Sequence, residues 1–218
     1  MSPHLSRPLV LLASLAAASA VLGSTFVGNN YGAAPSPGLY LVLTGLWFGL
    51  VIGFAAWRWA ERTVSAFATA FVITWIGWEA AVNVAVQIDG PALEGTVIPY
   101  GVRLYLAGFA AGALGALITW AGVAIYAQPL RRRAVVAAVV ATGALFGLLL
   151  PATNTFDSGL VLLVPWQVAI ALVIGANLVQ ETARPRDPRA LARPGSTGSR
   201  VTSLDYGVSQ CWQQSPNA

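Results

Sequence analysis

Lysine is absent from this sequence, and histidine and cysteine each occur only once, so all 12 basic residues are arginine. Without lysine the chain cannot form a retinal-type Schiff base, and a single cysteine cannot form a disulfide within the chain. His4 precedes the first apolar run and Cys211 lies in the polar C-terminal region, so no apolar segment offers the ligands that haem, copper or zinc require. We therefore expect neither a metal site nor a cofactor.

Charge is equally scarce, since charged residues make up 9% of the 218 residues and hydrophobic residues 56%. Soluble domains carry about 25% charged residues, so a helical membrane protein is the class that fits. The sequence has no Gly-rich phosphate loop, no Asp-rich motif for a magnesium-bound diphosphate and no basic, aromatic-interleaved face for nucleic acid. The exclusive use of arginine and the wealth of Ala, Gly and Val indicate a GC-rich bacterial genome, which predicts a multi-pass protein of the bacterial inner membrane.

Six apolar segments are long enough to form transmembrane helices, which need about 17–25 residues. They cover residues 8–27, 39–60, 64–88, 100–127, 134–151 and 159–180. The predicted fold is an all-α integral membrane protein, with a six-helix transmembrane bundle over residues 1–180. Residues 181–218 are rich in Pro, Arg, Ser and Gly, and they predict a disordered basic cytoplasmic tail.

The positions of the arginines predict how the six spans are oriented in the membrane. Eleven of the 12 fall on one side of a six-span arrangement, and the exception is Arg103. Cytoplasmic loops carry an excess of arginine and lysine, so both termini are predicted to be cytoplasmic. The first segment has a second interpretation, because Arg7, the apolar stretch and Ala18-Ser19-Ala20 resemble a cleavable signal peptide. The apolar run continues to Val27, which favours an uncleaved helix; cleavage would leave five spans in the same orientation.

Small residues in the fourth segment predict close helix packing. Gly108 and Gly112 are four residues apart and Gly115 follows. This spacing lets two helices approach closely in lipid. We expect these glycines to pack against another helix of the same chain.

Glu79 is the only acid in the middle of an apolar segment, the one over residues 64–88. A charged side chain at bilayer depth costs about 2.5–3.5 kcal/mol or more, so an intramembrane acid indicates a functional site. Residues four apart share a helix face, which places Glu79 on one stripe with Phe71, Trp75, Asn83 and Gln87. Lipid would not tolerate this stripe, and we expect it to point into the bundle.

The depths of polar and aromatic residues predict a pocket that opens to the outer leaflet. At about 1.5 Å per residue, Glu79 lies roughly 13 Å below the outer end of its helix, and residues of the second and sixth segments fall at similar depths. The long side chain of Arg103 could reach inward from a shallower level. The predicted pocket residues are Trp47, Trp75, Trp78, Glu79, Asn83, Arg103, Tyr105 and Gln167.

Three roles for Glu79 follow from its surroundings. Dry aromatic surroundings favour the neutral acid, which could donate a proton as a general acid. A contact with Arg103 would instead keep the carboxylate charged, as an anchor for a ligand. A structural role, in which Glu79 bonds to Asn83 or Gln167 and fixes the helix register, is the third.

The pair Trp78-Glu79 in an early apolar helix resembles the Trp-Glu element of small membrane-bound terpenoid cyclases, which close rings on prenylated indoles and meroterpenoids. The resemblance covers this one helix. It implies a catalytic Glu79 that protonates an epoxide or olefin, and aromatic walls from residues such as Trp47 and Trp75 that stabilise the carbocation. The family has a second acid late in the chain, and here the only acid near a late segment is Asp157.

Two other functions stay open. Six spans and the Ala13-x-x-x-Ala17 spacing of the first segment are similar to the vitamin-binding S subunits of energy-coupling-factor importers, which would make the pocket a small-solute site anchored by Glu79 and Arg103. The third is a non-catalytic subunit of a membrane complex. The expected partners are therefore a hydrophobic small molecule or lipid-like substrate, membrane lipids and, for the last two functions, other membrane proteins.

Overall fold

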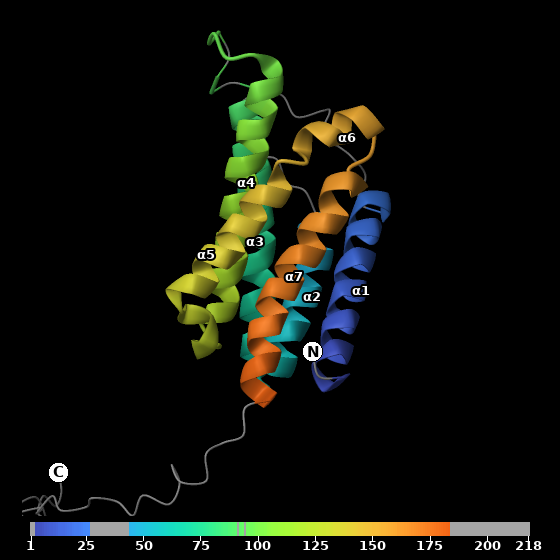
Figure 1. Cartoon of the computed structure of the whole chain (residues 1–218), viewed down its shortest axis with the longest axis vertical. Helices are drawn as coiled ribbons and strands as arrows, with labels where there is room; N and C mark the ends of the chain where they lie inside the picture. The colour runs from blue at the N-terminus through green and yellow to red at the C-terminus, as the bar shows by residue number, and fades with distance from the viewer. Residues whose placement is uncertain (1–2, 27–43, 91, 94, 184–218) are drawn as a thin grey trace, which may run out of the picture. The chain divides into compact units, whose positions relative to one another are not determined.

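The structure is a computed structural model that describes residues 3–26, 44–90, 92–93 and 95–183 (Figure 1). Every regular element in these ranges is helical, so the predicted all-α class is confirmed. The elements in chain order are α1 (Pro3–Phe26), α2 (Thr44–Trp59), α3 (Val64–Asp89), α4 (Tyr100–Ala124), the 3-10 turn η1 (Gln128–Arg131), α5 (Arg133–Gly147), α6 (Leu150–Phe156) and α7 (Leu160–Ala183).

Five helical stretches in the described part of the chain are long and apolar enough to cross a membrane. They are Ser6–Thr25, Val64–Asp89, Tyr100–Ala124, Arg133–Phe156 and Leu160–Gln180. The helix α2 is equally apolar but has 16 residues, or about 24 Å of helix. The second predicted segment begins at residue 39, which lies outside the described ranges, as does the predicted tail from residue 184 onward.

From α1 to α5, each long helix packs antiparallel to the next one in the chain, and α7 closes the bundle against α1 and α5 (Figure 1). The pairing of α4 with α5 illustrates this, because Gly108 lies against Gly147 and Gly112 lies against Gly143. The described chain starts and ends at the same end of the bundle (Figure 1).

Glycines determine how closely these helices approach. A Cβ atom on Gly108 or Gly112 would come closer than 3.0 Å to a backbone carbonyl oxygen of α5, which confirms the predicted packing role of these two residues within the chain. A second glycine row was not predicted. It lies on α2, with one glycine every four residues, and receives aromatic side chains of α3: Gly45 contacts Trp78, Gly49 contacts Phe71 and Gly53 contacts Phe67.

Local signals set the helix ends. Thr63 caps α3 by accepting a hydrogen bond from the Ala66 backbone N–H at 3.2 Å. Arg131 donates to the carbonyl oxygens of Ala124 and Ile125, at 2.8 and 2.7 Å, and so satisfies the end of α4. The link predicted between the fifth and sixth segments contains the short helix α6, which ends where Asp157 adopts the left-handed conformation with φ 48°.

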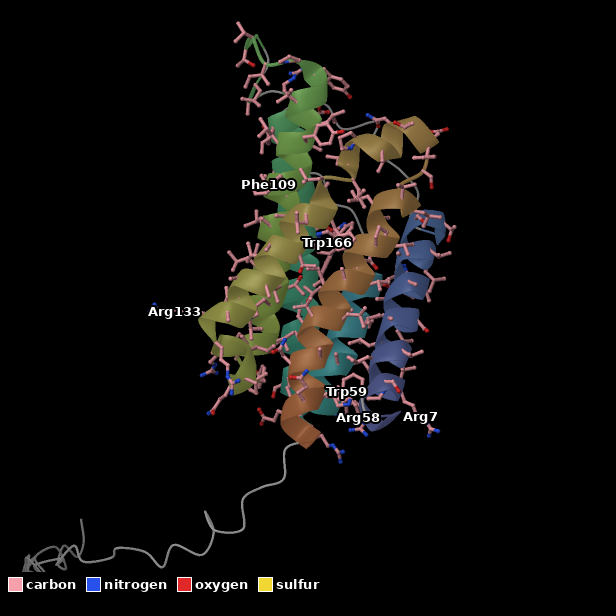
Figure 2. All side chains as sticks on the ribbon, in the orientation of Figure 1. Arg7, Arg58, Trp59, Phe109, Arg133 and Trp166 are labelled. Carbon is pink, nitrogen blue, oxygen red and sulfur yellow. The ribbon has the colours of Figure 1, made fainter. Side chains whose placement is uncertain are left out.

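Arginines gather at one end of the bundle. Figure 2 shows Arg7 near the start of α1 and Arg58 near the end of α2, both at the end where the described chain begins. Arg62 precedes α3, and the run 131–133 joins α4 to α5. Because neighbouring helices alternate in direction, these positions share that end, while Arg103 lies in the first turn of α4 at the opposite one.

Candidate functional site

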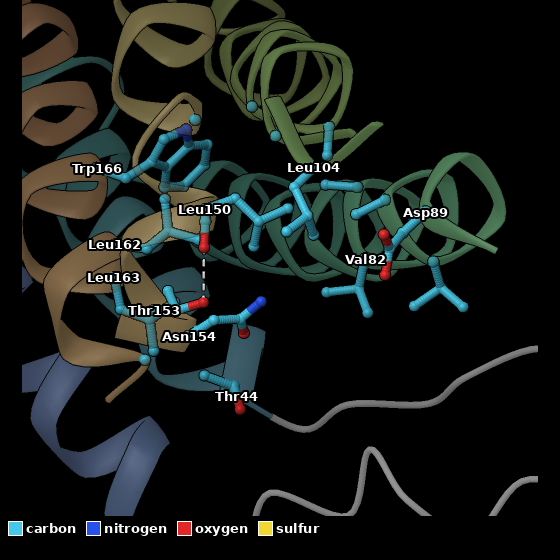
Figure 3. Close-up of a pocket in the computed structure, with 18 of the residues that line it drawn as sticks. Thr44, Val82, Asp89, Leu104, Leu150, Thr153, Asn154, Leu162, Leu163 and Trp166 are labelled. Carbon is cyan, nitrogen blue, oxygen red and sulfur yellow. Dashed lines mark hydrogen bonds between the residues drawn. The ribbon is translucent and has the colours of Figure 1, made fainter. Parts of the chain in front are cut away.

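A cavity of about 510 Å³ is lined mainly by α3, α4, α6 and α7 (Figure 3). Its lining residues fall in the half of α3 and of α4 that is remote from the arginine-rich end. Its volume falls in the range of about 300–1,000 Å³ that is typical of small-molecule sites. Apolar and small side chains make up most of its wall, including Val82, Leu104, Leu150, Leu162 and Leu163. The glycines at the α4–α5 contact, Gly108, Gly112 and Gly147, also line it.

Two tryptophans form the inner end of the cavity. The ring centres of Trp78 on α3 and Trp166 on α7 are 5.8 Å apart at an interplanar angle of 73°, an edge-to-face contact, and Phe48 packs on Trp166 in the same way. Trp166 donates its indole N–H to the Gly143 carbonyl oxygen at 3.2 Å. The side chain of Trp78 is 8% exposed, yet its Nε1 has no hydrogen-bond partner. Buried donors are nearly always paired, so this indole N–H is an exception in the structure; the ring of Trp78 packs against Gly45 of α2.

The outer end of the cavity is polar and acidic. Asp89, at the end of α3, and Tyr100, in the first turn of α4, line this end, and Asn154 and Asp157, from α6 and its C-terminus, also line the cavity. One carboxylate oxygen of Asp89, Oδ1, is buried and has no hydrogen-bond partner. Figure 3 shows Asp89 and Trp166 at opposite ends of the lining, with Leu104 between them. The cavity thus combines an apolar, aromatic inner part with an acidic mouth.

Glu79 does not line this cavity, although its neighbour Trp78 does. Its carboxylate accepts a hydrogen bond from the Trp75 indole N–H at 2.9 Å, and the Asn83 side chain donates to its backbone carbonyl at 2.8 Å. The three residues are only partly buried, and Ile76, on the same side of α3, is 53% exposed. The predicted stripe thus forms a local hydrogen-bonded cluster, at the edge of the face that α3 buries.

The other predicted pocket residues are dispersed. Gln167 is fully buried, but it faces α1, where its Oε1 accepts a hydrogen bond from Ser19 at 2.5 Å. Tyr105 is 52% exposed, Trp47 is partly buried, and neither lines the cavity. Of the eight predicted residues, Trp78 alone lines the cavity in this part of the chain.

Arg103 lies far from Glu79. On α4 the level of Glu79 is marked by Gly115, which packs against Ala81 and Gly77 of α3. Arg103 is twelve residues before Gly115, which is roughly 18 Å along the helix. Its guanidinium lies 5.6 Å from the centre of the Tyr100 ring. An ion-paired Glu79–Arg103 anchor therefore does not form in this arrangement.

Sequence reasoning missed Asp89 and Trp166. Asp89 comes at the end of an apolar segment, and Trp166 follows Pro165 in the sixth segment. One signal was available for Asp89: Trp78, Val82, Ala85 and Asp89 recur at helical spacing, and all four line the cavity. Within the described residues, no group of three or more His, Cys, Asp or Glu side chains is placed to hold a metal ion.

Comparisons of the chain with protein-family models, curated proteins and solved structures found no match.

Proposed function

We propose that the chain crosses a bacterial inner membrane six times, with both termini in the cytoplasm. The alternating helix directions, the shared end of the arginines and the five apolar stretches support this topology. The packing of α1 supports an uncleaved first span, because Ala16 and Ala20 are fully buried and Ser19 forms a hydrogen bond with α7.

Within this topology, the protein binds a hydrophobic small molecule in the cavity. The observation that carries this proposal is the cavity of about 510 Å³, which is walled by leucines, valines and an edge-to-face pair of tryptophans. An apolar ligand gains roughly 25 cal/mol for each Å² of apolar surface that it removes from water. A few polar groups at the two ends of such a site would fix the ligand's orientation.

Filling the cavity tests the proposal. Ala85→Phe places a ring in the cavity, whereas Ala80→Phe adds the same ring to the same helix at a position that does not line it. Binding of 1-dodecanol to the full-length protein in lipid nanodiscs is measured by the rise of the unfolding temperature with ligand concentration. We expect Ala85→Phe to weaken binding by at least about tenfold and Ala80→Phe to leave it unchanged. Equal binding by both variants would contradict a ligand site in this cavity.

A terpenoid cyclase is the second candidate, and the edge-to-face pair Trp78–Trp166 favours it because tryptophan faces stabilise cations. Asp89 is the acid with a buried, unpartnered oxygen at the cavity, so a cyclase would take its proton from Asp89 and not from Glu79. Membranes that contain the protein are given a farnesylated substrate, and cyclic products are sought by mass spectrometry. The candidate predicts activity that Asp89→Asn abolishes and Glu79→Gln retains; no cyclic product would exclude it.

An importer subunit would use the same cavity for a small solute. Co-purification with an ATPase and a coupling subunit would distinguish it from a protein that acts alone.

A further inference from the structure

We propose that the cavity selects an amphiphile with a cationic head, in which an ammonium group binds at Asp89 and an apolar tail extends to Trp78 and Trp166. This inference rests on the proposed ligand-binding function and is independent of the cyclase candidate. It specifies the charge of the ligand's head group, which the volume and the apolar walls of the cavity alone do not determine.

The charges at the mouth carry the first step. Asp89 and Asp157 both line the cavity, and no arginine is among the described residues that do so. Oδ1 of Asp89 is buried without a partner, and a buried carboxylate oxygen is costly unless a donor reaches it. Arg103, in the first turn of α4, places its guanidinium over the Tyr100 ring. Within the described residues, no hydrogen bond or salt bridge joins Arg103 to Asp89. The mouth therefore attracts a cation and repels an anion.

The second step is the distance between the polar ends. Trp78 and Asp89 are eleven residues apart on one face of α3, which corresponds to roughly 16 Å. Val82 and Ala85 lie between them on this face and line the same cavity. A ligand that reaches both ends is consequently elongated, with its apolar part against α3, α4 and α7 (Figure 3).

The third step concerns the inner end. Trp78 is 8% exposed and its N–H has no partner, although Trp166 beside it is fully hydrogen-bonded. The ring of Trp78 packs against Gly45 of α2, and Trp78 and Trp166 both line the cavity. The two indole rings give the inner end of the cavity an aromatic surface, which fits the apolar tail of the ligand.

Three probes with one tail test the head-group charge: dodecylamine, 1-dodecanol and dodecanoate. Each is titrated into the full-length protein in nanodiscs of an uncharged lipid, and apparent affinities are taken from the rise in unfolding temperature. A charge-assisted hydrogen bond contributes about 1.5–3 kcal/mol, so dodecylamine should bind at least about tenfold more tightly than 1-dodecanol, and dodecanoate most weakly. Asp89→Asn should abolish the advantage of the amine over the alcohol when both probes are measured on this variant.

Asp157→Asn is the matched control, because Asp157 is an exposed acid at the same mouth; its effect on the amine should stay below about fivefold. If Asp89→Asn does not fold, the order of the three probes on the unmodified protein decides, together with the loss of the amine's advantage as salt is added. Equal affinities for the amine and the alcohol would overturn the inference, and so would an advantage of the amine that persists in Asp89→Asn. In either case, binding of the alcohol would still support the cavity as a ligand site. Failure of all three probes to stabilise the protein would overturn both proposals.

Discussion

Replacing Gly112 with alanine should destabilise the bundle, because this glycine sets the distance between α4 and α5. A Cβ atom at Gly112 would come closer than 3.0 Å to the Gly143 carbonyl oxygen, a backbone atom that cannot rotate away, and would lie 3.0 Å from the Gly147 Cα atom. The two helices would have to separate. A gap of about 0.5–1 Å forfeits a quarter to a half of the dispersion energy of each contact across the interface.

The cost can be estimated from overpacked cores, in which an extra methyl or methylene group typically destabilises by about 1–3 kcal/mol. Alanine also has a higher helix propensity than glycine, by about 1 kcal/mol in soluble helices, which partly offsets this cost. We expect a net loss of roughly 1–2 kcal/mol in the free energy of unfolding. Since Gly112 also lines the cavity, the affinity for 1-dodecanol should change as well.

Unfolding by titration with sodium dodecyl sulfate, followed by far-ultraviolet circular dichroism, measures the change in stability. Gly101→Ala is the matched control: Gly101 lies in the first turn of the same helix, and an added Cβ would meet nothing within 4 Å there. The control should be as stable as the parent protein or slightly more so. If Gly112→Ala proved as stable as Gly101→Ala, the close α4–α5 contact would be refuted.

Two further predictions concern hydrogen bonds outside the cavity. Ser19→Ala removes the donor to the fully buried Gln167, and it should lower the free energy of unfolding by about 0.6–1.7 kcal/mol in the same titration; unchanged stability would argue against the α1–α7 contact. Glu79→Gln retains an acceptor for the Trp75 N–H, so stability and dodecanol binding should both be unchanged. A tenfold loss of dodecanol binding in Glu79→Gln would indicate that Glu79 belongs to the ligand site.

The helical fold could be predicted because the lengths of the apolar segments and the positions of the arginines can be read directly from the sequence. The α4 glycines were predicted for the same reason, since a spacing of four residues is visible in sequence. The glycine row on α2 was not singled out, because its function depends on the aromatic side chains of α3 that it receives. A glycine every four residues is common in apolar helices, and only the packing partner shows which row is used.

The site was harder to predict because rotation about a helix axis decides which side chains meet. Trp78 and Glu79 are consecutive residues, which a helix points about 100° apart. One of them lines the cavity, and the other bonds along the edge of α3. Depth estimates cannot resolve this difference, which is why Glu79 was predicted to be in the pocket. Asp89, at the end of the same helix, belongs to the site because it lines a cavity that residues of α4, α6 and α7 also line.

Photolabelling tests most directly whether the cavity among α3, α4 and α7 is the ligand site. A dodecanol that carries a diazirine at its tail is bound to the full-length protein, activated by light and located by peptide sequencing with mass spectrometry. The cavity predicts labels at Trp78, Val82, Leu104 and Trp166, which excess unlabelled 1-dodecanol prevents. Labelling confined to outward-facing residues such as Phe109, which is 50% exposed, would contradict it.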